Sequence, residues 1–166
     1  CEIYMGSFKT KSIDVLINNA AILEDSPLVS LTKEGFVKHD VLLWKKIIDT
    51  NLSSVFYVTS SVVEKMLMKR TKGLIINISS ISAEGNPGQT AYSASKAGVN
   101  ALTKTWSKEL VGLGIRVAGI SPGFTRTKMI MSEKRNNLVN EWERKIPLKR
   151  LAEPSEIADA ILFVIK

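Results

Sequence analysis

The sequence predicts an α/β fold in which helices cover both faces of an open, doubly wound parallel sheet. Three short runs are largely apolar rather than alternating, namely Ile13–Ile17, Leu74–Ile78 and Ile115–Ile120. Such runs are typical of strands that are buried on both faces. The longer segments after these runs carry apolar residues three and four positions apart, which indicates helices. The alternation of strand and helix favours the doubly wound arrangement.

Each predicted strand ends in small polar residues or a turn. The groups that follow the strands, in chain order, are Asn18-Asn19, Ser79-Ser80 and Ser121-Pro122-Gly123. Ligands of open α/β sheets bind outside the carboxyl ends of the strands. We therefore expect a ligand site where these three groups converge.

The helical pattern predicts three long helices. The first runs from Asp40 to about Arg70, and the second from Thr90 to about Leu113. The third opens at Pro154, where we expect Ser155 to be the N-cap and Glu156 to lie in the first turn.

Composition limits the possible classes of function. The 166 residues are 45% apolar, which suits a single domain over residues 1–166. No apolar run is long enough to cross a bilayer, so no membrane partner is expected. One cysteine and one histidine exclude a disulfide framework and metal centres built from several such residues, and a reducing cytoplasm is the default location. The formal charge is +7, but aromatic residues are not interleaved with the basic residues. This composition favours a solvated basic surface over nucleic-acid binding.

Tyr92 and Lys96 are the strongest candidates for chemistry. They are four residues apart at the start of a predicted helix and therefore share one face. A lysine cation beside a tyrosine stabilises the phenolate and lowers the phenol pKa from about 10, which makes a usable general acid/base. Ser79 or Ser80 could hold a substrate oxygen against the phenol. The alternative is a pair on the helix surface without a function.

Five motifs occur together in one order: Asn18–Ala21, Asp49–Leu52, Asn77–Ser80, Tyr92–Gly98 and Ser121–Gly123. In this order they resemble the classical short-chain dehydrogenases/reductases, a family that includes 3-oxoacyl-(acyl-carrier-protein) reductases. The resemblance extends from about Ile13 to Lys166. It implies a Rossmann-like fold, NAD or NADP as cofactor, and a ketone, 3-oxoacyl compound or secondary alcohol as substrate.

The resemblance also implies a role for individual residues. Tyr92 would be the general acid/base, Lys96 would lower its pKa and bind the nicotinamide ribose, Ser80 would orient the substrate, and Asn51 would help to hold a water in the proton relay. The remaining expected cofactor contacts are Asn18 and Ala20 on the adenosine side, and Pro122, Gly123, Thr125 and Thr127 at the nicotinamide. The gap from Ser80 to Tyr92 is one residue shorter than the commonest family spacing, so Ser79 stays an alternative to Ser80.

The chain also departs from the family pattern. Ala21 stands where the family usually has glycine, and the segment around residues 28–41 is longer than in most members, which predicts an added loop or small hairpin. The family's glycine-rich turn for pyrophosphate and its final strand have no counterpart. We therefore expect the fold to be incomplete at both ends and the isolated chain to be inactive, and the choice between NAD and NADP stays open. The alternative is a catalytically inactive subunit or scaffold that lacks the phosphate loop.

Members of the family assemble through their two long helices. The resemblance therefore implies a homodimer or homotetramer, with apolar contacts from Val55, Phe56, Val62, Val63, Leu102 and Trp106. Lys69 and Arg70 resemble part of the acyl-carrier docking patch of the reductases, whereas Leu113 takes the place of a residue that is often basic there.

Overall fold

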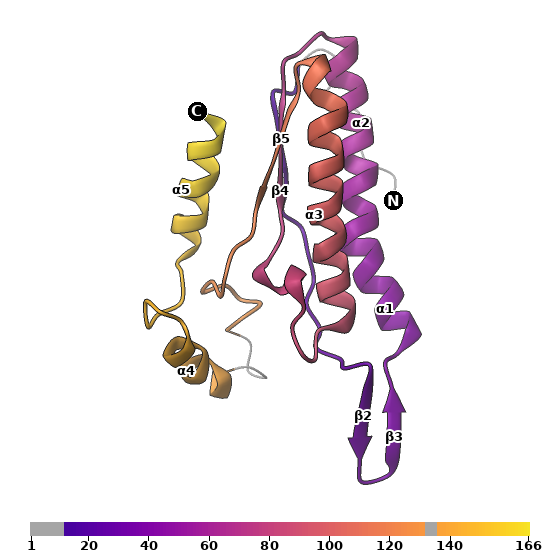
Figure 1. Cartoon of the computed structure of the whole chain (residues 1–166), viewed down its shortest axis with the longest axis vertical. Helices are drawn as coiled ribbons and strands as arrows, with labels where there is room; N and C mark the ends of the chain where they lie inside the picture. The colour runs from indigo at the N-terminus through magenta and orange to yellow at the C-terminus, as the bar shows by residue number, and fades with distance from the viewer. Residues whose placement is uncertain (1–11, 132–135) are drawn as a thin grey trace.

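A three-stranded parallel sheet lies at the centre of the computed structural model, which describes residues 12–131 and 136–166 (Figure 1). The strand order is β1-β4-β5, with bounds of Val15–Asn18, Leu74–Ile78 and Arg116–Ile120. This arrangement confirms the predicted α/β fold with a parallel sheet. The prediction of one domain over residues 1–166 also covers residues 1–11 and 132–135, which lie outside the described part of the chain.

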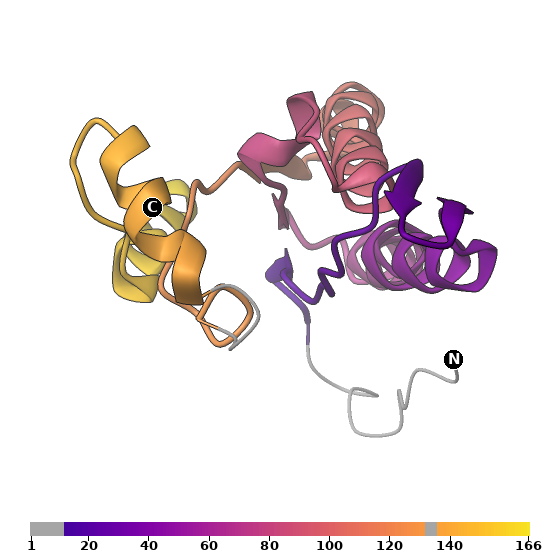
Figure 2. The same ribbon diagram turned by 90° about the horizontal axis from the view of Figure 1, so that it is seen from below.

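Two long helices cover one face of the sheet. Helix α2 (Ser54–Met68) and helix α3 (Thr90–Leu110) run side by side in both ribbon views (Figures 1 and 2). The helix predicted from Asp40 to Arg70 is divided into α1 (Val41–Ile48), one π-helical segment (Asp49–Ser53) and α2. The carboxylate of Asp40 caps α1 by accepting a hydrogen bond from the backbone N–H of Leu42 at 2.9 Å. Helix α3 ends in a short 3-10 segment (Val111–Leu113).

Helix α5 (Pro154–Ile165) covers the other face, and Figure 2 shows it across the sheet from α2 and α3. The prediction that Ser155 caps this helix is wrong, because Glu153 is the N-cap. Pro154 occupies the first turn, where its missing N–H costs nothing. The Glu156 side chain accepts from the Glu153 N–H at 2.8 Å, which completes a capping box. Helix α4 (Asn136–Lys145), between β5 and α5, had no counterpart among the predicted helices.

Strand β4 explains why a continuous apolar run is required. Ile75 packs toward α2 with Val62 and Met66, all of them buried. The alternate residues of β4 face the opposite side, where they pack against Ile161 and Val164 of α5. Because both faces of β4 are covered, neither set of side chains could be polar without a partner.

A β-hairpin projects at one end of the molecule, and Figure 1 shows it below α1. Strands β2 (Val29–Thr32) and β3 (Gly35–Lys38) pair antiparallel, with Leu31 opposite Phe36. Gly35 adopts φ +121° at the turn, a conformation that residues with a side chain rarely adopt. The expected insertion at residues 28–41 is therefore a hairpin. Among the described helices, none is long and apolar enough to cross a membrane.

Candidate active site

The carboxyl ends of β1, β4 and β5 open into a cavity of about 700 Å³. Eight of the sequence-predicted site residues line it: Ala20, Ser80, Tyr92, Lys96, Pro122, Gly123, Thr125 and Thr127. The other two, Asn18 and Asn51, do not line it. The cavity lies at the edge where the polar groups after the strands were expected to converge.

Tyr92 lies in the first turn of α3 and is 8% exposed, with Ser80 as its hydrogen-bond partner. The Ser80 hydroxyl oxygen accepts from the Ser82 backbone N–H at 3.1 Å, which leaves the hydroxyl proton free to donate to the phenol oxygen. Two oxygens that can bind one carbonyl oxygen therefore stand together in the cavity wall.

The pKa of Tyr92 in this structure is raised above the ordinary value of a phenol. Burial raises the pKa of Tyr92 above 10.0, and only the hydrogen bond from Ser80 opposes that rise. The Lys96 ammonium lies 5.8 Å from the centre of the Tyr92 ring and donates instead to the backbone carbonyl of Ile78 at 2.8 Å. Tyr92 is therefore a protonated phenol at neutral pH.

Lys96 is itself unusual because its side chain is almost fully buried, at 3% exposure. Burial lowers the pKa of Lys96 to about 8, since removing an ammonium from water disfavours its charged form. The bond to the Ile78 carbonyl uses one of its three N–H donors. The remaining donors belong to a side chain that lines the cavity next to Tyr92.

The two serines after β4 have different environments. Ser79 is buried, and its hydroxyl donates to the backbone carbonyl of Lys96 at 3.1 Å. Ser80 is half-buried and holds the phenol of Tyr92. Both serines line the cavity, but Ser79 links β4 to α3, whereas Ser80 is the hydrogen-bond partner of the Tyr92 phenol.

Asn51 lies in the π-helical segment and is 1% exposed. Its side-chain oxygen accepts from the N–H of Ile22 at 2.8 Å, and its amide nitrogen donates to the carbonyl of Ile22 at 2.9 Å. The same amide nitrogen reaches the Ser95 hydroxyl at 3.3 Å. Asn51 therefore pins the loop after β1 to the helices, and both N–H groups of its side chain are already used.

Replacing Asn51 by leucine should destabilise the fold by about 2 kcal/mol, because the N–H and carbonyl of Ile22 would lose their partners at a partly buried position. Urea denaturation followed by circular dichroism measures this change. The matched control is Asn140→Leu on the exposed surface of α4, which should change stability by less than about 0.5 kcal/mol. Equal effects of the two substitutions would show that the Ile22 contacts contribute little.

Asn18 is directed away from the cavity. Its amide nitrogen donates to Thr59 at 2.9 Å and to Asn77 at 2.8 Å, and Asn77 in turn donates to Thr103 at 2.9 Å. This ladder joins β1 and β4 to α2 and α3 through side chains that would otherwise be unsatisfied. The neighbouring Asn19 lines the cavity in place of Asn18. The sequence placed Asn19 in the polar group after β1 but not among the expected cofactor contacts.

The loop after β5 forms the opposite wall. Thr125 is buried and pairs with Ala152 in an isolated parallel bridge. The Ala152 N–H donates to the carbonyl of Phe124 at 2.9 Å, and the Ile81 N–H donates to the carbonyl of Pro122 at 3.1 Å. These backbone bonds hold the Pro122–Thr127 segment against the residues that follow β4 and those that precede α5.

Most of the remaining wall is apolar and was not predicted. Gln89, three residues before Tyr92, adds an amide, and the apolar lining comes from Ile17, Leu23, Ile78, Ile81, Phe124, Met129, Ile130, Ile157, Ala158 and Ile161. These residues come from many parts of the chain, so no local pattern could have found them.

The cavity suits an aromatic ring with an attached ribose. Apolar walls can enclose a flat ring, and the Tyr92 hydroxyl and the Lys96 ammonium are donors on one side. The described residues contain no cluster of three or more histidine, cysteine, aspartate or glutamate side chains that could hold a metal ion. The apolar walls, together with the Tyr92 hydroxyl and the Lys96 ammonium, fit a nicotinamide nucleoside.

Comparison with known proteins agrees with this geometry. Residues 7–166 match a family model described as enoyl-(acyl carrier protein) reductase. The chain is 46% identical to a 3-oxoacyl-[acyl-carrier-protein] reductase FabG of Thermotoga maritima over 154 aligned residues. The aligned residues are 92% of this chain and 58% of that protein. It is 44% identical over 162 residues to the protein of that name from Chlamydia trachomatis. These residues are 97% of this chain and 60% of that protein.

A third relative carries a different name. An acetoacetyl-CoA reductase of an Acinetobacter species is 40% identical over 154 residues, which are 92% of this chain and 58% of that protein. The chain thus spans about three fifths of the length of the curated relatives it matches.

Proposed function

This chain belongs to the short-chain dehydrogenase/reductase family, and we propose that the protein carrying it reduces a 3-oxoacyl thioester or related ketone with NADH or NADPH. The observation that carries the proposal is the hydrogen-bonded pair of Ser80 and Tyr92, beside Lys96, in the wall of one cavity. The relatives' names, which mention acyl-carrier-protein and CoA substrates, support a thioester substrate.

A nicotinamide cofactor, when bound, supplies the hydride. The chain's own residues then bind and protonate the substrate oxygen. Ser80 donates to the carbonyl oxygen and holds it against Tyr92, whose phenol transfers its proton as negative charge develops on that oxygen. The raised pKa of Tyr92 keeps the proton on the phenol until the substrate requires it.

Lys96 has two proposed tasks. Its cation stabilises the phenolate that remains when Tyr92 has lost its proton, and its free N–H donors bind the ribose next to the nicotinamide. Ala20, Pro122, Gly123, Thr125 and Thr127 complete the proposed cofactor contacts. Asn51 acts on this site by fixing the loop that contains Ala20, and we keep the proposal that it helps to hold a water of the proton relay.

The proposed assembly is a homodimer or homotetramer through α2 and α3. Phe56 on α2 is 50% exposed, which supports an apolar contact there, although Val55 and Val62 are already buried within the chain. We also propose a cytoplasmic location, on the basis that a single cysteine suits a reducing compartment.

The direct test is to purify the protein carrying this chain and follow NADH and NADPH oxidation with acetoacetyl-N-acetylcysteamine as substrate. Turnover with either cofactor is expected, and cofactor fluorescence should report binding without substrate. A protein that binds neither cofactor and reduces neither this thioester nor simple ketones would refute the proposed activity and favour a scaffold role.

The reduction rate should depend on pH through Lys96. Its pKa of about 8 means that the cation is present below that pH and is lost as pH rises through it, while Tyr92 stays protonated. We expect kcat for ketone reduction to fall above about pH 8, because neutral Lys96 no longer stabilises the phenolate. In Lys96→Arg the guanidinium stays charged, so the fall should move to higher pH even if the maximal rate is lower.

The test is to measure steady-state kcat from about pH 6 to about pH 10 in the unaltered protein and in Lys96→Arg. An unchanged inflection in Lys96→Arg would assign the pH dependence to another group.

A further inference from the structure

A smaller cavity of about 250 Å³ adjoins the main one, and we call it the side cavity. The wall residues that the two cavities share are Leu23, Gln89, Phe124 and Ile130. Gln89 is the N-cap residue of α3, and Tyr92 lies in the first turn of the same helix. The side cavity is therefore next to the place where the substrate carbonyl is proposed to bind.

The inner wall of the side cavity is apolar. Its half-buried apolar residues are Leu23, Phe124, Ile130 and Trp142. The charged wall residues, Asp25 and Lys145, are exposed and therefore belong to its rim. Lys145 pairs with Glu141, and Asp25 accepts from the Gln89 amide at 3.1 Å, so both rim charges already have a partner. The side cavity thus suits an apolar group more than a charged one.

Helix α4 supplies one wall of the side cavity and is attached to the main cavity. The Trp142 ring stacks on Phe124, with ring centres 4.7 Å apart and an angle of 13° between the planes. Arg126, on the loop after β5, bonds to Glu143 of α4 at 3.3 Å and to Glu153 at the start of α5 at 2.9 Å. The stack and the ion pairs together hold α4 against the wall that both cavities share.

The volume of the side cavity limits what it can hold. A water-sized group occupies about 30 Å³, so the cavity has room for about eight such groups. The pantetheine arm of a carrier or CoA thioester has many more heavy atoms than this and is rich in polar groups. The acyl chain on the other side of the reacting carbonyl is apolar and can be short enough. Size and wall chemistry therefore both favour the acyl chain over the arm.

We propose that the side cavity binds the acyl chain beyond the reacting carbonyl, so that 3-oxoacyl substrates of medium length are preferred to acetoacetyl substrates. The inference rests on the proposed function and names the substrate class of that same site. Each chain carbon that enters exchanges water for contact with Leu23 and Trp142, which stabilises the bound substrate. Carbons beyond about the eighth pass the charged rim and add little.

The test compares acetoacetyl, 3-oxohexanoyl and 3-oxooctanoyl thioesters of N-acetylcysteamine in the protein carrying this chain. Complete burial of one CH₂ raises kcat/KM about fourfold. We therefore expect kcat/KM for the 3-oxooctanoyl thioester to exceed that for the acetoacetyl thioester at least about tenfold. We call this quotient the chain-length ratio. A ratio near one in the unaltered protein would overturn the proposal.

Asn86→Phe should lower the chain-length ratio at least about fivefold, because the new ring takes the space of the acyl chain. Asn86 lines the side cavity but not the main one. Its N–H donates to the Ser93 hydroxyl at 3.2 Å and its carbonyl accepts from the Gln89 N–H at 3.0 Å, and neither bond uses the Asn86 side chain. Turnover of the acetoacetyl thioester, which has only a methyl group beyond the carbonyl, should stay within about twofold.

Asn140→Phe is the matched control, because it adds the same ring to the exposed surface of α4, outside both cavities. It should keep the chain-length ratio of the unaltered protein. The proposal is overturned if Asn86→Phe leaves the ratio unchanged or if Asn140→Phe lowers it equally. It is also overturned if Asn86→Phe weakens only the use of acetoacetyl-pantetheine, because the arm would then occupy the side cavity.

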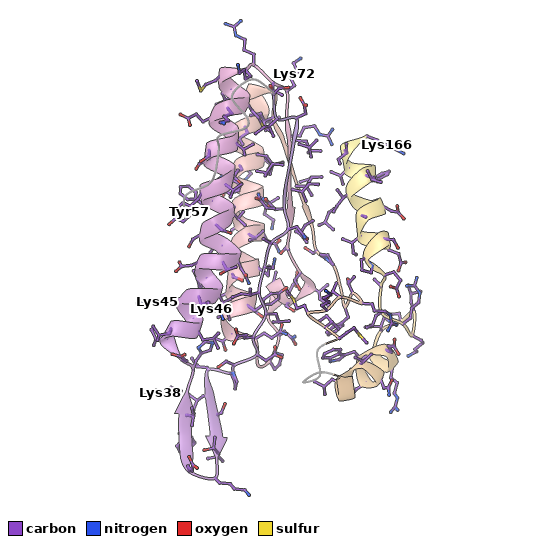
Figure 3. All side chains as sticks on the ribbon, turned by 180° about the vertical axis from the view of Figure 1, so that it is seen from behind. Lys38, Lys45, Lys46, Tyr57, Lys72 and Lys166 are labelled. Carbon is purple, nitrogen blue, oxygen red and sulfur yellow. The ribbon has the colours of Figure 1, made fainter. Side chains whose placement is uncertain are left out.

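Failure of the proposed function is detected separately by a binding measurement. Octanoyl-N-acetylcysteamine has no ketone to reduce, and its titration without cofactor should change the tryptophan emission through Trp142. Trp142→Phe keeps a ring against Phe124 and should lose this change. Trp44→Phe should keep it, since Trp44 is on α1, and Figure 3 shows the neighbouring Lys45 and Lys46 across the molecule from α4.

This titration also judges an Asn86→Phe protein that loses acetoacetyl turnover. Affinity for the octanoyl thioester that falls about fivefold in Asn86→Phe, but not in Asn140→Phe, supports the side cavity even if no substrate is reduced. No binding to the unaltered protein, or an emission change that persists in Trp142→Phe, overturns the proposal.

Discussion

Replacing Tyr92 by phenylalanine should lower kcat for ketone reduction by about 10²–10⁴-fold, the range expected for loss of a general acid. The ring is retained, and only the hydroxyl that donates the proton and contacts Ser80 is removed. Because that hydroxyl is largely buried and shares its hydrogen bond with a single side chain, the fold should survive with a stability change near 1 kcal/mol. Cofactor affinity, measured by nucleotide fluorescence, should change much less than turnover.

The control for this substitution is Tyr57→Phe. Tyr57 lies on α2 and is 55% exposed, so removal of its hydroxyl tests the same chemical change far from the cavity. It should keep the turnover of the unaltered protein. A Tyr92→Phe protein that reduces ketones at the rate of the Tyr57→Phe control would remove Tyr92 from the proposed proton transfer.

Replacing Ser80 by alanine is expected to lower kcat by about 10²–10³-fold, the usual cost of losing one donor to a developing oxyanion. The loss should appear in kcat more than in KM, since the bond to the substrate oxygen strengthens in the transition state.

Ser79→Ala is the matched comparison and should have the opposite profile. Its hydroxyl donates to the carbonyl of Lys96, so its removal should cost about 1 kcal/mol of stability and much less turnover. Thermal denaturation and steady-state kinetics on both variants separate the two roles. The reverse ranking of the kcat values would assign the substrate contact to Ser79.

Patterns along the chain were sufficient for the frame of the fold. The apolar run Leu74–Ile78 predicted β4 with its observed bounds, because a strand covered on both faces cannot alternate with polar residues. The spacing of Tyr92 and Lys96 placed them on one helix face, and both line the cavity. Such patterns did not predict that β1 starts at Val15 instead of Ile13, or that Asp49–Ser53 is π-helical. Element boundaries depend on neighbouring segments that periodicity does not describe.

Other features depended on residues that are distant in the sequence. Nothing local separates Asn18 from Asn19, yet Asn18 bonds to Thr59 and Asn77 while Asn19 lines the cavity. Adjacent side chains at a strand end point to opposite faces, and only the packing of α2 on the sheet decides which face is the interior. The contacts of Asn51 could not be predicted for the same reason, because its hydrogen-bond partner Ile22 is 29 positions away in the sequence.

Patterns in the sequence predicted the strands of the parallel sheet and its long helices, the sheet edge at which the cavity opens, and Tyr92, Lys96 and the serine pair as candidate site residues. Two further features follow from the packing of distant segments: Ser80 rather than Ser79 is hydrogen-bonded to the phenol, and burial raises the pKa of Tyr92. The physical reason is that strand and helix patterns follow from side chains close together in the chain. A pKa follows instead from the solvent that distant segments exclude, and from donors such as the Ser80 hydroxyl that folding brings within reach.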